Sequence, residues 1–528
     1  MVKRIELALT PEQAETEFNL RPLISRKLSV SKNEINSYRV IKKSIDARSK
    51  NVKIRLQLVA YVGEEQPPIE KFNTNFKNVA NAEPVYIIGA GPAGLFAALS
   101  FLEAGLKPVI IERGKDVRDR RRDLAIINRE GLVNPNSNYC FGEGGAGTYS
   151  DGKLYTRSNK RGNVNRVLEL FVHFGADENI LINAHPHIGT NKLPGIITEM
   201  RQCIIDHGGE IHFNTILKDI EVLNNEIKSI SLAKINEDNT LGAEEKIATN
   251  KLLLATGHSA RDVYHILDKN NIEIESKDFA LGVRVEHPQS MVDKIQYSCN
   301  TRSKYLPPAS YSLTYTKNEN SVYSFCMCPG GIIAPASTMP NEIVVNGWSP
   351  SKRNNPFANS GMVVNVGLND FKDFKKHNAL QGMYFQSSIE QKAYTMGGGN
   401  LKAPAQTTSD FVNNSLSNSL PSCSYVPGVH AVDLHELLPE NIKITLRDAL
   451  KHFDKKMKGF VSSESIMVGV ESRTSSPVRI PRDRETFMHT KVKGLFPCAE
   501  GAGYAGGIVS AAIDGQKCAE SITKFVNS

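Results

Sequence analysis

Two short apolar runs with an apolar helical stretch between them give the strongest structural signal in the chain. Residues 85–88 read Val-Tyr-Ile-Ile and residues 109–112 read Val-Ile-Ile-Glu, and the segment between them opens with glycines and continues as an apolar helical run. Short apolar runs bounded by turn residues are typical of strands buried on both faces, and the longer run predicts a buried helix. Residues 85–112 therefore predict a strand, a turn, a helix and a second, parallel strand.

The first 80 residues follow a different pattern. Residues 2–9 alternate polar and apolar side chains like a strand, and Thr10-Pro11-Glu12 then supplies the N-cap and first-turn residues of a helix. Residues 37–47 and 53–62 are also strand-like, and two prolines with an Asn-rich stretch then resemble a linker. We expect a small α+β domain over residues 1–80.

The segment after residue 112 extends the predicted parallel sheet. Helices are expected at 164–174 and 194–207, with a strand-like run at 180–182, a third parallel strand at 209–214 and then a small antiparallel meander. The apolar strand at 251–257 ends in Ala-Thr-Gly, small residues that let a cofactor pass over the strand end. Ser259 is a candidate cap for a helix at 260–268. Residues 84–275 are therefore interpreted as the first part of a cofactor-binding domain.

The rest of the chain divides into an inserted region and a returning segment. Residues 276–490 are mainly strands and loops, with the clearest strand at 279–286, the clearest helical parts at 370–376 and 442–457, and no second nucleotide-binding pattern. Residues 491–528 again give a strand, a loop and a helix. The pattern as a whole predicts an α/β fold with α+β parts: a Rossmann-like domain of discontinuous pieces, a β-rich substrate domain inserted at 276–490, and the small N-terminal domain.

The turn at residues 89–94, Gly-Ala-Gly-Pro-Ala-Gly, carries the clearest candidate chemistry. Gly89 allows the tight turn, Gly91 lets a diphosphate approach the backbone, and Gly94 lets the helix lie close to the sheet. Pro92 suits a helix start, where free N–H groups and the helix dipole favour a diphosphate. Glu112 ends the second strand, where a carboxylate can accept hydrogen bonds from an adenosine ribose.

The same glycine spacing occurs twice more, and its context differs each time. Residues 142–147 have no convincing strand before them and no helical run after them, so we do not interpret them as a second nucleotide fold. Residues 501–506 follow a short strand and precede a helix. The N-terminus of that helix can face the electron-rich end of a flavin, and Glu500 can hydrogen-bond its ribityl chain. A simple NAD enzyme has no need of this second strand, loop and helix.

Several polar residues have two interpretations. The glycine-rich loop at 138–154 could wrap a flat ligand, so that Ser150, Asp151 and Lys153 either contact that ligand or only close turns. The arginines at 118–122 either reach phosphate or form a solvated helix face. Similarly, one further cluster either holds an anionic substrate or lies on solvated strand edges: Arg473, Arg479, Arg482 and Arg484.

Composition and charge narrow the class of protein. Among 528 residues, Lys and Arg exceed Asp and Glu by 64 to 56, a mild excess that suits an anionic ligand. Much of that excess lies before residue 79, which holds about fifteen basic against nine acidic residues. No long uncharged apolar window or leader-like start is present, so we expect a protein of the cytoplasm without a membrane segment.

The eight cysteines have no zinc-like spacing, so no metal site is predicted. Cys326 and Cys328 are the closest pair. On a regular strand both thiols would point to one face, where they either pack or act as redox groups.

The chain resembles a family of largely uncharacterised FAD-dependent dehydrogenases, within the wider flavoproteins of the glutathione-reductase and p-hydroxybenzoate-hydroxylase type. The matching runs are residues 43–48, 89–94, 141–153, 326–331, 469–477 and 500–507. The resemblance implies bound FAD. The residues expected to bind it are Gly89, Gly91, Pro92, Ala93, Gly94, Glu112, Arg113, Gly145, Gly147, Ser150, Asp151, Lys153, Thr256, Gly257, Glu500, Gly501, Gly507 and Ile508.

The sequence leads to one main functional hypothesis and two alternatives. The main hypothesis is an FAD-dependent oxidoreductase that transfers hydride to or from a small-molecule substrate of unknown identity. Anionic compounds are among the candidate substrates. NADH and NADPH are candidate reductants. The first alternative is an RNA-directed flavoprotein that docks nucleic acid through its basic front domain. The second is a protein that holds a flavin without catalysis. None of the thirteen histidines is marked out by spacing, so no catalytic residue is named.

Overall fold

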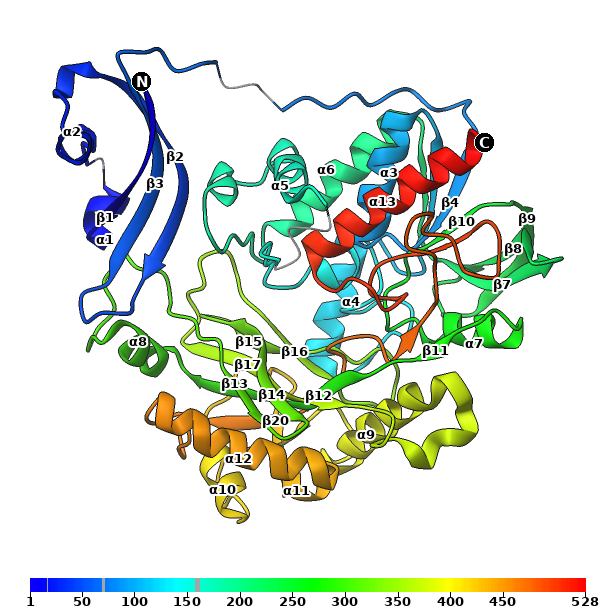
Figure 1. Cartoon of the computed structure of the whole chain (residues 1–528). Coiled ribbons are helices and arrows are strands. Elements are labelled where there is room, and N and C mark those ends of the chain that lie inside the picture. The colour runs from blue at the N-terminus through cyan, green and yellow to red at the C-terminus, as the bar shows by residue number, and fades with distance from the viewer. Residues whose placement is uncertain (17, 69–71, 157–161) are drawn as a thin grey trace.

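The structure is a computed structural model that describes residues 1–16, 18–68, 72–156 and 162–528. It has a mixed α/β fold with a parallel sheet and several antiparallel sheets (Figure 1). Residues 69–71 of the expected linker lie outside the described residues. Within the described ranges, no helix is both long enough and apolar enough to cross a membrane.

The parallel sheet is assembled from distant parts of the chain. Its strand order is β22-β10-β4-β5-β6. All four pairings are parallel, and Ile88 at the end of β4 lies between Leu254 of β10 and Ile111 of β5. The carboxyl ends of the strands therefore meet at one edge of the sheet. The strands are β4 (Pro84–Ile88), β5 (Lys107–Ile111), β6 (Glu210–His212), β10 (Leu252–Leu254) and β22 (Leu495–Pro497).

Each face of the parallel sheet packs against a different layer. Successive strand residues point to opposite faces, so Ile87 joins the core beneath the helices and Ile88 joins the core on the other side. One face is covered by α3 (Pro92–Ala104), α5 (Val164–His173), α6 (Leu193–Asp206) and α13 (Ile508–Val526). The other is covered by α7 (Arg261–Lys269) and the antiparallel sheet of β7 (Thr215–Leu223), β8 (Glu226–Ile235) and β9 (Leu241–Ala248). The expected βαβ unit, third parallel strand and meander are all present.

Helices α3 and α13 lie side by side, although about 400 residues separate them in the sequence (Figure 1). Gly515 of α13 sits against the backbone of Ala93, so closely that a Cβ at this position would overlap the Ala93 carbonyl oxygen. Gly94 plays the same part between α3 and the turn, because a Cβ there would overlap the carbonyl oxygen of Gly89. Glycine at these points lets both helices approach their neighbours without a side chain between them.

A mixed, mostly antiparallel sheet occupies the inserted region. Its order is β13-β14-β17-β12-β20-β18-β19, with β18 and β19 parallel. The strands are β12 (Phe279–Pro288), β13 (Thr314–Lys317), β14 (Asn320–Cys328), β17 (Phe357–Val366), β18 (Ala403–Thr407), β19 (Val429–Ala431) and β20 (Ile466–Glu471). Two small pairs are β11 (Glu275–Ser276) with β21 (Val478–Arg479) and β15 (Ile332–Pro335) with β16 (Val345–Trp348).

The helices of this region are α8 (Gln289–Tyr297), α9 (Gln381–Met396), α10 (Thr408–Asn413), α11 (Leu434–Leu437) and α12 (Glu440–Lys456). Helices α10, α11 and α12 lie beneath the seven-stranded sheet as drawn in Figure 1. Phe453 of α12 and Val285 of β12 belong to the same buried cluster. This cluster also contains Leu9 and Leu58 of the first 62 residues, so the inserted region shares a core with the front of the chain and not with the parallel sheet.

The front of the chain forms a three-stranded antiparallel sheet of order β1-β3-β2. Its elements are β1 (Val2–Leu9), α1 (Pro11–Glu15), α2 (Arg21–Leu28), a 3₁₀ turn at Lys32–Glu34, β2 (Ile35–Asp46) and β3 (Lys53–Val62). Thr10 caps α1 as expected, in a capping box with Gln13. The backbone N–H of Lys43 donates to the carbonyl of Ile182 at 2.8 Å, which joins this sheet to the rest of the molecule. The predicted division of the chain into four segments stays a prediction.

Four expectations were wrong in detail. The run at 180–182 is not a strand but belongs to a 3₁₀ turn, Glu178–Leu181. Ser259 does not cap α7, whose N-cap is Ala260 without a side-chain bond. The helical part at 370–376 is a 3₁₀ segment, Lys372–Leu380. Helix α9 was not expected, because its buried face includes Gln386 and Glu390, and these polar residues break the hydrophobic period.

The contact between α3 and α13 gives a first prediction. Gly515→Ala places a methyl group against the backbone of Ala93, and overpacking of this kind costs about 1–3 kcal/mol. We expect a lower midpoint of thermal unfolding, measured by circular dichroism. The matched control is Gly195→Ala in α6, where a Cβ meets no atom within 4 Å and alanine is the better helix former. Equal unfolding midpoints for the two variants would contradict the close contact.

Candidate cofactor cavity

A cavity of about 350 Å³ lies where the strands β4, β5 and β10 of the parallel sheet end. It brings together most of the residues expected to bind a cofactor. Those that line it are Gly89, Gly91, Pro92, Ala93, Glu112, Arg113, Gly145, Gly147, Ser150, Asp151, Lys153, Thr256, Gly257, Glu500, Gly507 and Ile508. Gly94 and Gly501 lie behind the lining, where their lack of a side chain allows close packing against Gly89 and Gly257. Their roles toward a cofactor stay predictions.

Two helix N-termini open on this cavity. Gly91 is the N-cap of α3 and makes no side-chain cap bond, so the first N–H groups of the helix remain for a ligand. Gly507 is the N-cap of α13, with a φ of 87° that favours glycine. Both helices place the positive ends of their dipoles at the same space. This is the arrangement expected for residues 89–94 and for the tail of the chain.

Glu112 connects three loops at the cavity rim. Its carboxylate accepts a 2.9 Å hydrogen bond from the N–H of Ala90 and two more, also of 2.9 Å, from the N–H groups of Gly114 and Gly142. Oε1 accepts the bonds from Gly114 and Gly142, whereas Oε2 accepts only the bond from Ala90 and has a further lone pair. Glu112 can therefore accept from a ribose hydroxyl while it holds the glycine turn and the 138–147 loop in place.

The glycine-rich loop is fastened by Arg120 of α4 (Val117–Glu130). This side chain is fully buried and donates to the carbonyl oxygens of Asn138 at 2.8 Å, Tyr139 at 2.9 Å and Glu143 at 2.8 Å. Neither a phosphate contact nor a solvated helix face describes Arg120, so both expectations were wrong for this residue. Arg122 on the same helix does face solvent.

Asp151 and Lys153 form a charged group at one wall. Asp151 is ion-paired with Arg353 at 2.9 Å and with Lys153 at 3.2 Å. Burial alone would raise the pKa of Asp151, but these two cations lower it to about 2. Oδ1 of Asp151 is buried and has no hydrogen-bond partner among the described residues. A buried acceptor without a partner is the kind of atom that a ligand or water satisfies.

The arginine cluster after β20 divides in two: Arg479 of β21 and Arg484 are exposed, as expected for a solvated strand edge, whereas Arg473 and Arg482 are buried in ion pairs. Arg473 is buried at the cavity wall, and its guanidinium pairs with Glu342 and Glu390, both at 3.0 Å. Arg482 pairs with Asp514 at 2.7 Å. Two carboxylates already neutralise Arg473, so it orders the wall and leaves little charge for an anionic substrate.

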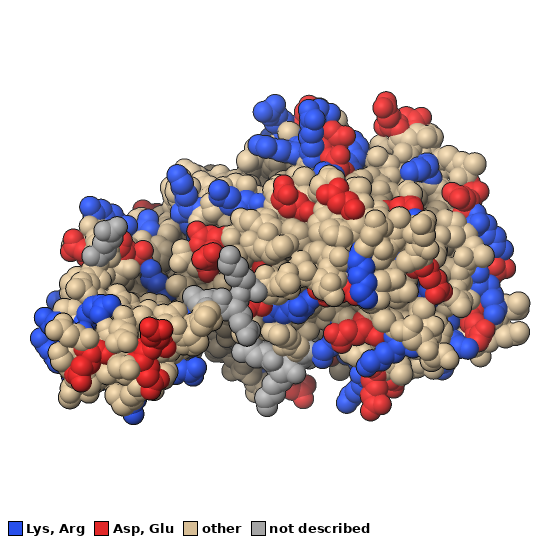
Figure 2. Space-filling model, turned by 90° about the horizontal axis from the view of Figure 1, so that it is seen from above, with Lys and Arg blue, Asp and Glu red and all other residues tan. Residues whose placement is uncertain are grey.

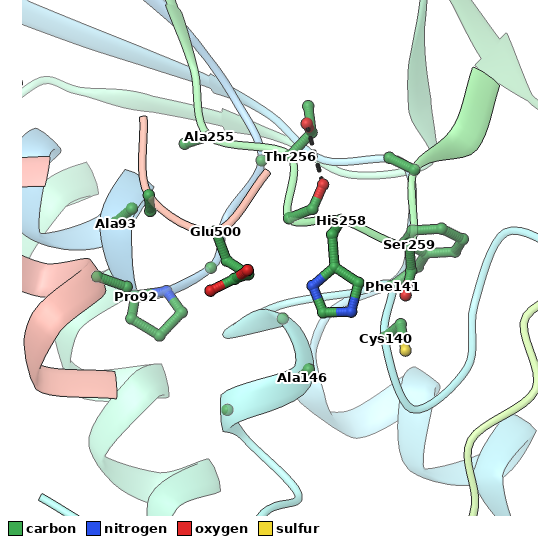
Figure 3. A pocket seen from close by; sticks show the side chains of 18 of the residues that line it. Pro92, Ala93, Cys140, Phe141, Ala146, Ala255, Thr256, His258, Ser259 and Glu500 are labelled. Carbon is green, nitrogen blue, oxygen red and sulfur yellow. Dashed lines mark hydrogen bonds between the residues drawn. The ribbon is translucent and has the colours of Figure 1, made fainter. Parts of the chain in front are cut away.

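His258 is a cavity residue that the sequence did not mark out. It follows the Ala-Thr-Gly end of β10 directly, which is the one signal that could have identified it. Burial and the nearby charge of Arg473 lower its pKa to about 4, so its ring is neutral at pH 7. In Figure 3, His258 and Glu500 project into the space between Pro92 on one side and Cys140 and Phe141 on the other.

Glu500 stands at the turn before α13. Its carboxylate accepts a 2.8 Å hydrogen bond from the backbone N–H of Ser476. Burial raises its pKa, while that hydrogen bond and Lys277 oppose the rise. Glu500 thus links the returning tail to the segment after β20, and a carboxylate oxygen remains at the cavity.

The cavity fits a bound dinucleotide. A Cβ at Gly91 or Gly257 would meet no protein atom within 4 Å, so at both positions the bare backbone faces free space beside the cavity. That space is surrounded by free helix N–H groups, by an acidic residue at the end of the second strand and by a strand that ends in small residues. This donor and acceptor set is the one a dinucleotide requires.

Comparison with known proteins identifies the family. Residues 278–474 match the family described as FAD-dependent protein, C-terminal domain-like, and residues 1–61 match a domain family of unknown function. A Clostridium beijerinckii protein described as uncharacterized is 38% identical over an alignment of 522 residues, and the match covers 95% of each chain. The chain therefore belongs to this family of FAD-dependent proteins, and the resemblance seen in its motifs is confirmed.

Three solved structures show low similarity to the chain. A flavoprotein/dehydrogenase from Cytophaga hutchinsonii has a TM-score of 0.37 at 11% identity, over 84% of this chain and 79% of that one. The flavin-dependent brominase Bmp2 has a TM-score of 0.36 at 14% identity, over 84% and 80%. A flavocytochrome c3 fumarate reductase has a TM-score of 0.33 at 10% identity, over 85% and 80%.

Arg120 gives the prediction for this site. Arg120→Met removes the donor to the carbonyl groups of Asn138 and Tyr139, whereas the Glu143 carbonyl still accepts from the Thr148 hydroxyl. Each buried carbonyl left without a donor costs about 1–3 kcal/mol. We expect a lower unfolding temperature and faster cleavage within residues 138–147 in limited proteolysis. The control is Arg122→Met on the same helix, whose side chain is 70% exposed and whose pair with Asp119 contributes at most about 1 kcal/mol. Equal cleavage rates in both variants would show that Arg120 does not hold the loop.

Proposed function

We propose that the protein is an FAD-dependent oxidoreductase that binds FAD in the cavity and acts by hydride transfer on a small-molecule substrate. The observation that carries this proposal is the convergence of the α3 and α13 N-termini on one cavity, with Gly91 open toward it. An NAD enzyme with one nucleotide fold has no use for the second helix N-terminus. The membership of the family of FAD-dependent proteins supports the same conclusion.

The chain's own groups would bind the two ends of the cofactor differently. The free N–H of Ala93 in the first turn of α3 suits the diphosphate, because Pro92 before it has no N–H, and Glu112 suits the adenosine ribose. At the other end, the N-terminus of α13 favours negative charge, and Glu500 has an oxygen for a ribityl hydroxyl. In this proposal the parallel sheet and its helices, residues 84–275 and 491–528, form the FAD-binding domain.

FAD supplies two-electron redox chemistry, with hydride gained or lost at the flavin ring. The protein's part is to orient, to exclude water and to supply protons. His258 is neutral at pH 7, so it can give or accept a hydrogen bond without adding charge. The inserted seven-stranded sheet and its neighbours contribute Cys326, Asn346 and Glu471 to the cavity wall, which supports residues 276–490 as the substrate domain.

The RNA-directed alternative gains no support from the front domain. Several of its basic side chains are ion-paired: Arg55 with Glu6 and Asp46, Arg48 with Asp46, and Lys43 with Glu15. Figure 2 shows basic and acidic side chains interspersed over the surface seen from above. A continuous basic face is the footprint that nucleic acid requires. The alternative therefore stays a prediction, as does the flavin-holding protein without catalysis.

The first test is cofactor binding. We expect the purified protein to be yellow and to release FAD on denaturation, as measured by absorbance and chromatography. Gly91→Val fills the space beside the diphosphate site without touching protein atoms, and we expect FAD binding at least about tenfold weaker, equal to about 1.4 kcal/mol. The control is Gly195→Val, an equally open position on the exposed side of α6. Retention of FAD by Gly91→Val with wild-type affinity would contradict the assignment.

The second test concerns the reductant. We expect NADH or NADPH to bleach the flavin absorbance under anaerobic conditions, in a rapid-mixing spectrophotometer, because an oxidoreductase must be reduced by some donor. Photochemical reduction of the same sample gives the fully bleached reference. A flavin that neither nicotinamide nor any candidate metabolite bleaches, although light does, would favour the flavin-holding alternative.

A further inference from the structure

Two thiols and an ammonium group meet at the cavity wall opposite the helix N-termini. Lys153 Nζ lies 3.7 Å from Cys326 Sγ and 3.9 Å from Cys328 Sγ. Cys326 lines the cavity and is partly exposed, whereas Cys328 is fully buried behind it. Lys153 comes from the glycine-rich loop and the thiols come from β14, so this contact joins the two halves of the cavity.

The charges around the thiols favour a thiolate at the cavity. Hydrogen bonding with Cys328, together with the charges of Lys153 and Arg284, holds the pKa of Cys326 well below its usual range, although burial and Asp151 act in the opposite direction. Burial and the neighbouring Cys326 raise the pKa of Cys328. The pair therefore divides into an accessible thiolate and a buried, protonated thiol.

Other charges near the pair are already matched. Arg284 is fully buried, pairs with Glu471 at 2.8 Å, and also donates to the carbonyl of Cys326 at 2.7 Å and toward Cys328 Sγ at 3.4 Å. Asp151 is shared between Arg353 and Lys153. Lys153 is thus the cation that faces both sulfur atoms from the cavity side.

The backbone at this point departs from a regular strand. The pairing of β14 with β17 shifts register between Phe325 and Cys328, and Cys326 has a φ of 44°. A residue with a side chain rarely adopts this conformation, and such strain is concentrated at functional sites. The thiol of Cys328 turns back toward residue 326, with its Sγ 3.2 Å from the Cys326 carbonyl oxygen.

We propose that Cys326 and Cys328 form a redox-active dithiol at the cavity, which reduces disulfide compounds by thiol–disulfide exchange. Cys326 is the attacking thiolate and Cys328 is the resolving thiol. The structure assigns Lys153 as the residue that keeps Cys326 ionised. The inference rests on the proposed function in one respect: the reduced flavin would return the disulfide to the dithiol.

The exchange balances without any other reactant. The Cys326 thiolate attacks one sulfur of the compound, the disulfide bond of the compound breaks, and its second sulfur leaves as a thiolate. Cys328 gives its proton to that thiolate and attacks the Cys326 sulfur, and the bond from Cys326 to the compound breaks. The compound gains two electrons and leaves as one thiol and one thiolate, while the protein loses two electrons as a Cys326–Cys328 disulfide.

The first experiment measures thiol reactivity in the full-length protein. Iodoacetamide is allowed to react across a pH series, and the alkylation rate of each cysteine is read by peptide mass mapping. We expect the alkylation rate of Cys326 to reach half its maximum at a pH at least about one unit below 8.5, the pKa of an ordinary thiol. Lys153→Met should move that midpoint upward, and Lys153→Arg should restore it. Cys140 lines the same cavity, its thiol faces the Ala336 carbonyl and has no lysine partner among the described residues, and it is the internal control.

The second experiment follows the disulfide. Hydroxyethyl disulfide should convert the wild-type peptide that holds both cysteines to an internal disulfide, lighter than the dithiol by two hydrogen atoms. Cys328→Ser should stop at a mixed disulfide on Cys326, and Cys140→Ser should behave as the wild type does.

Two results would overturn the proposal: Cys326 alkylated no faster than Cys140 at neutral pH, or a wild-type protein that stops at the mixed disulfide. Both experiments measure the chemical state of the cysteines and do not depend on flavin absorbance. Formation of the internal disulfide by a protein that binds no FAD would contradict the proposed function and leave the dithiol in place.

Discussion

The close approach of α13 to α3 is the contact on which the cavity depends. Gly515 lets the backbone of α13 rest against Ala93, and this contact fixes where the α13 N-terminus lies relative to that of α3. Two helix dipoles then act on one space, and each alone would provide only an ordinary anion site. A side chain between the helices would move the tail away from the glycine turn. The packing of two helices thus sets the chemistry of the site.

The remaining walls depend on buried polar groups that satisfy one another. Glu112 and Arg120 hold the glycine-rich loop through backbone N–H and carbonyl groups, so that this loop is ordered despite its many glycines. Arg473 is matched by two carboxylates on the opposite wall. A buried polar group that loses its partner destabilises the folded state, whereas groups that keep their partners hold the wall in one conformation. The cavity therefore has fixed walls, and the Cys326 thiol of β14 is accessible at one of them.

The sequence predicts the parts of the site that depend on local pattern. The strand, turn and helix around Gly91, the position of Glu112 and the tail helix all follow from hydrophobic period and turn residues. The partners of Arg120 and Arg473 do not, because they are set by contacts between segments far apart in the chain. Helix α9 was missed since its buried face carries Gln386 and Glu390, whose partners are equally remote. His258 has no local signal beyond the strand end before it.

Hydrogen–deuterium exchange with and without FAD tests the central claim most directly, because it reports on both remote segments in one sample. If α3 and α13 close over one cofactor, FAD slows amide exchange in residues 89–94 and in residues 501–511 together, and leaves the distant strand β1 unchanged. Protection of the first segment alone, in a protein that demonstrably holds FAD, would contradict the account.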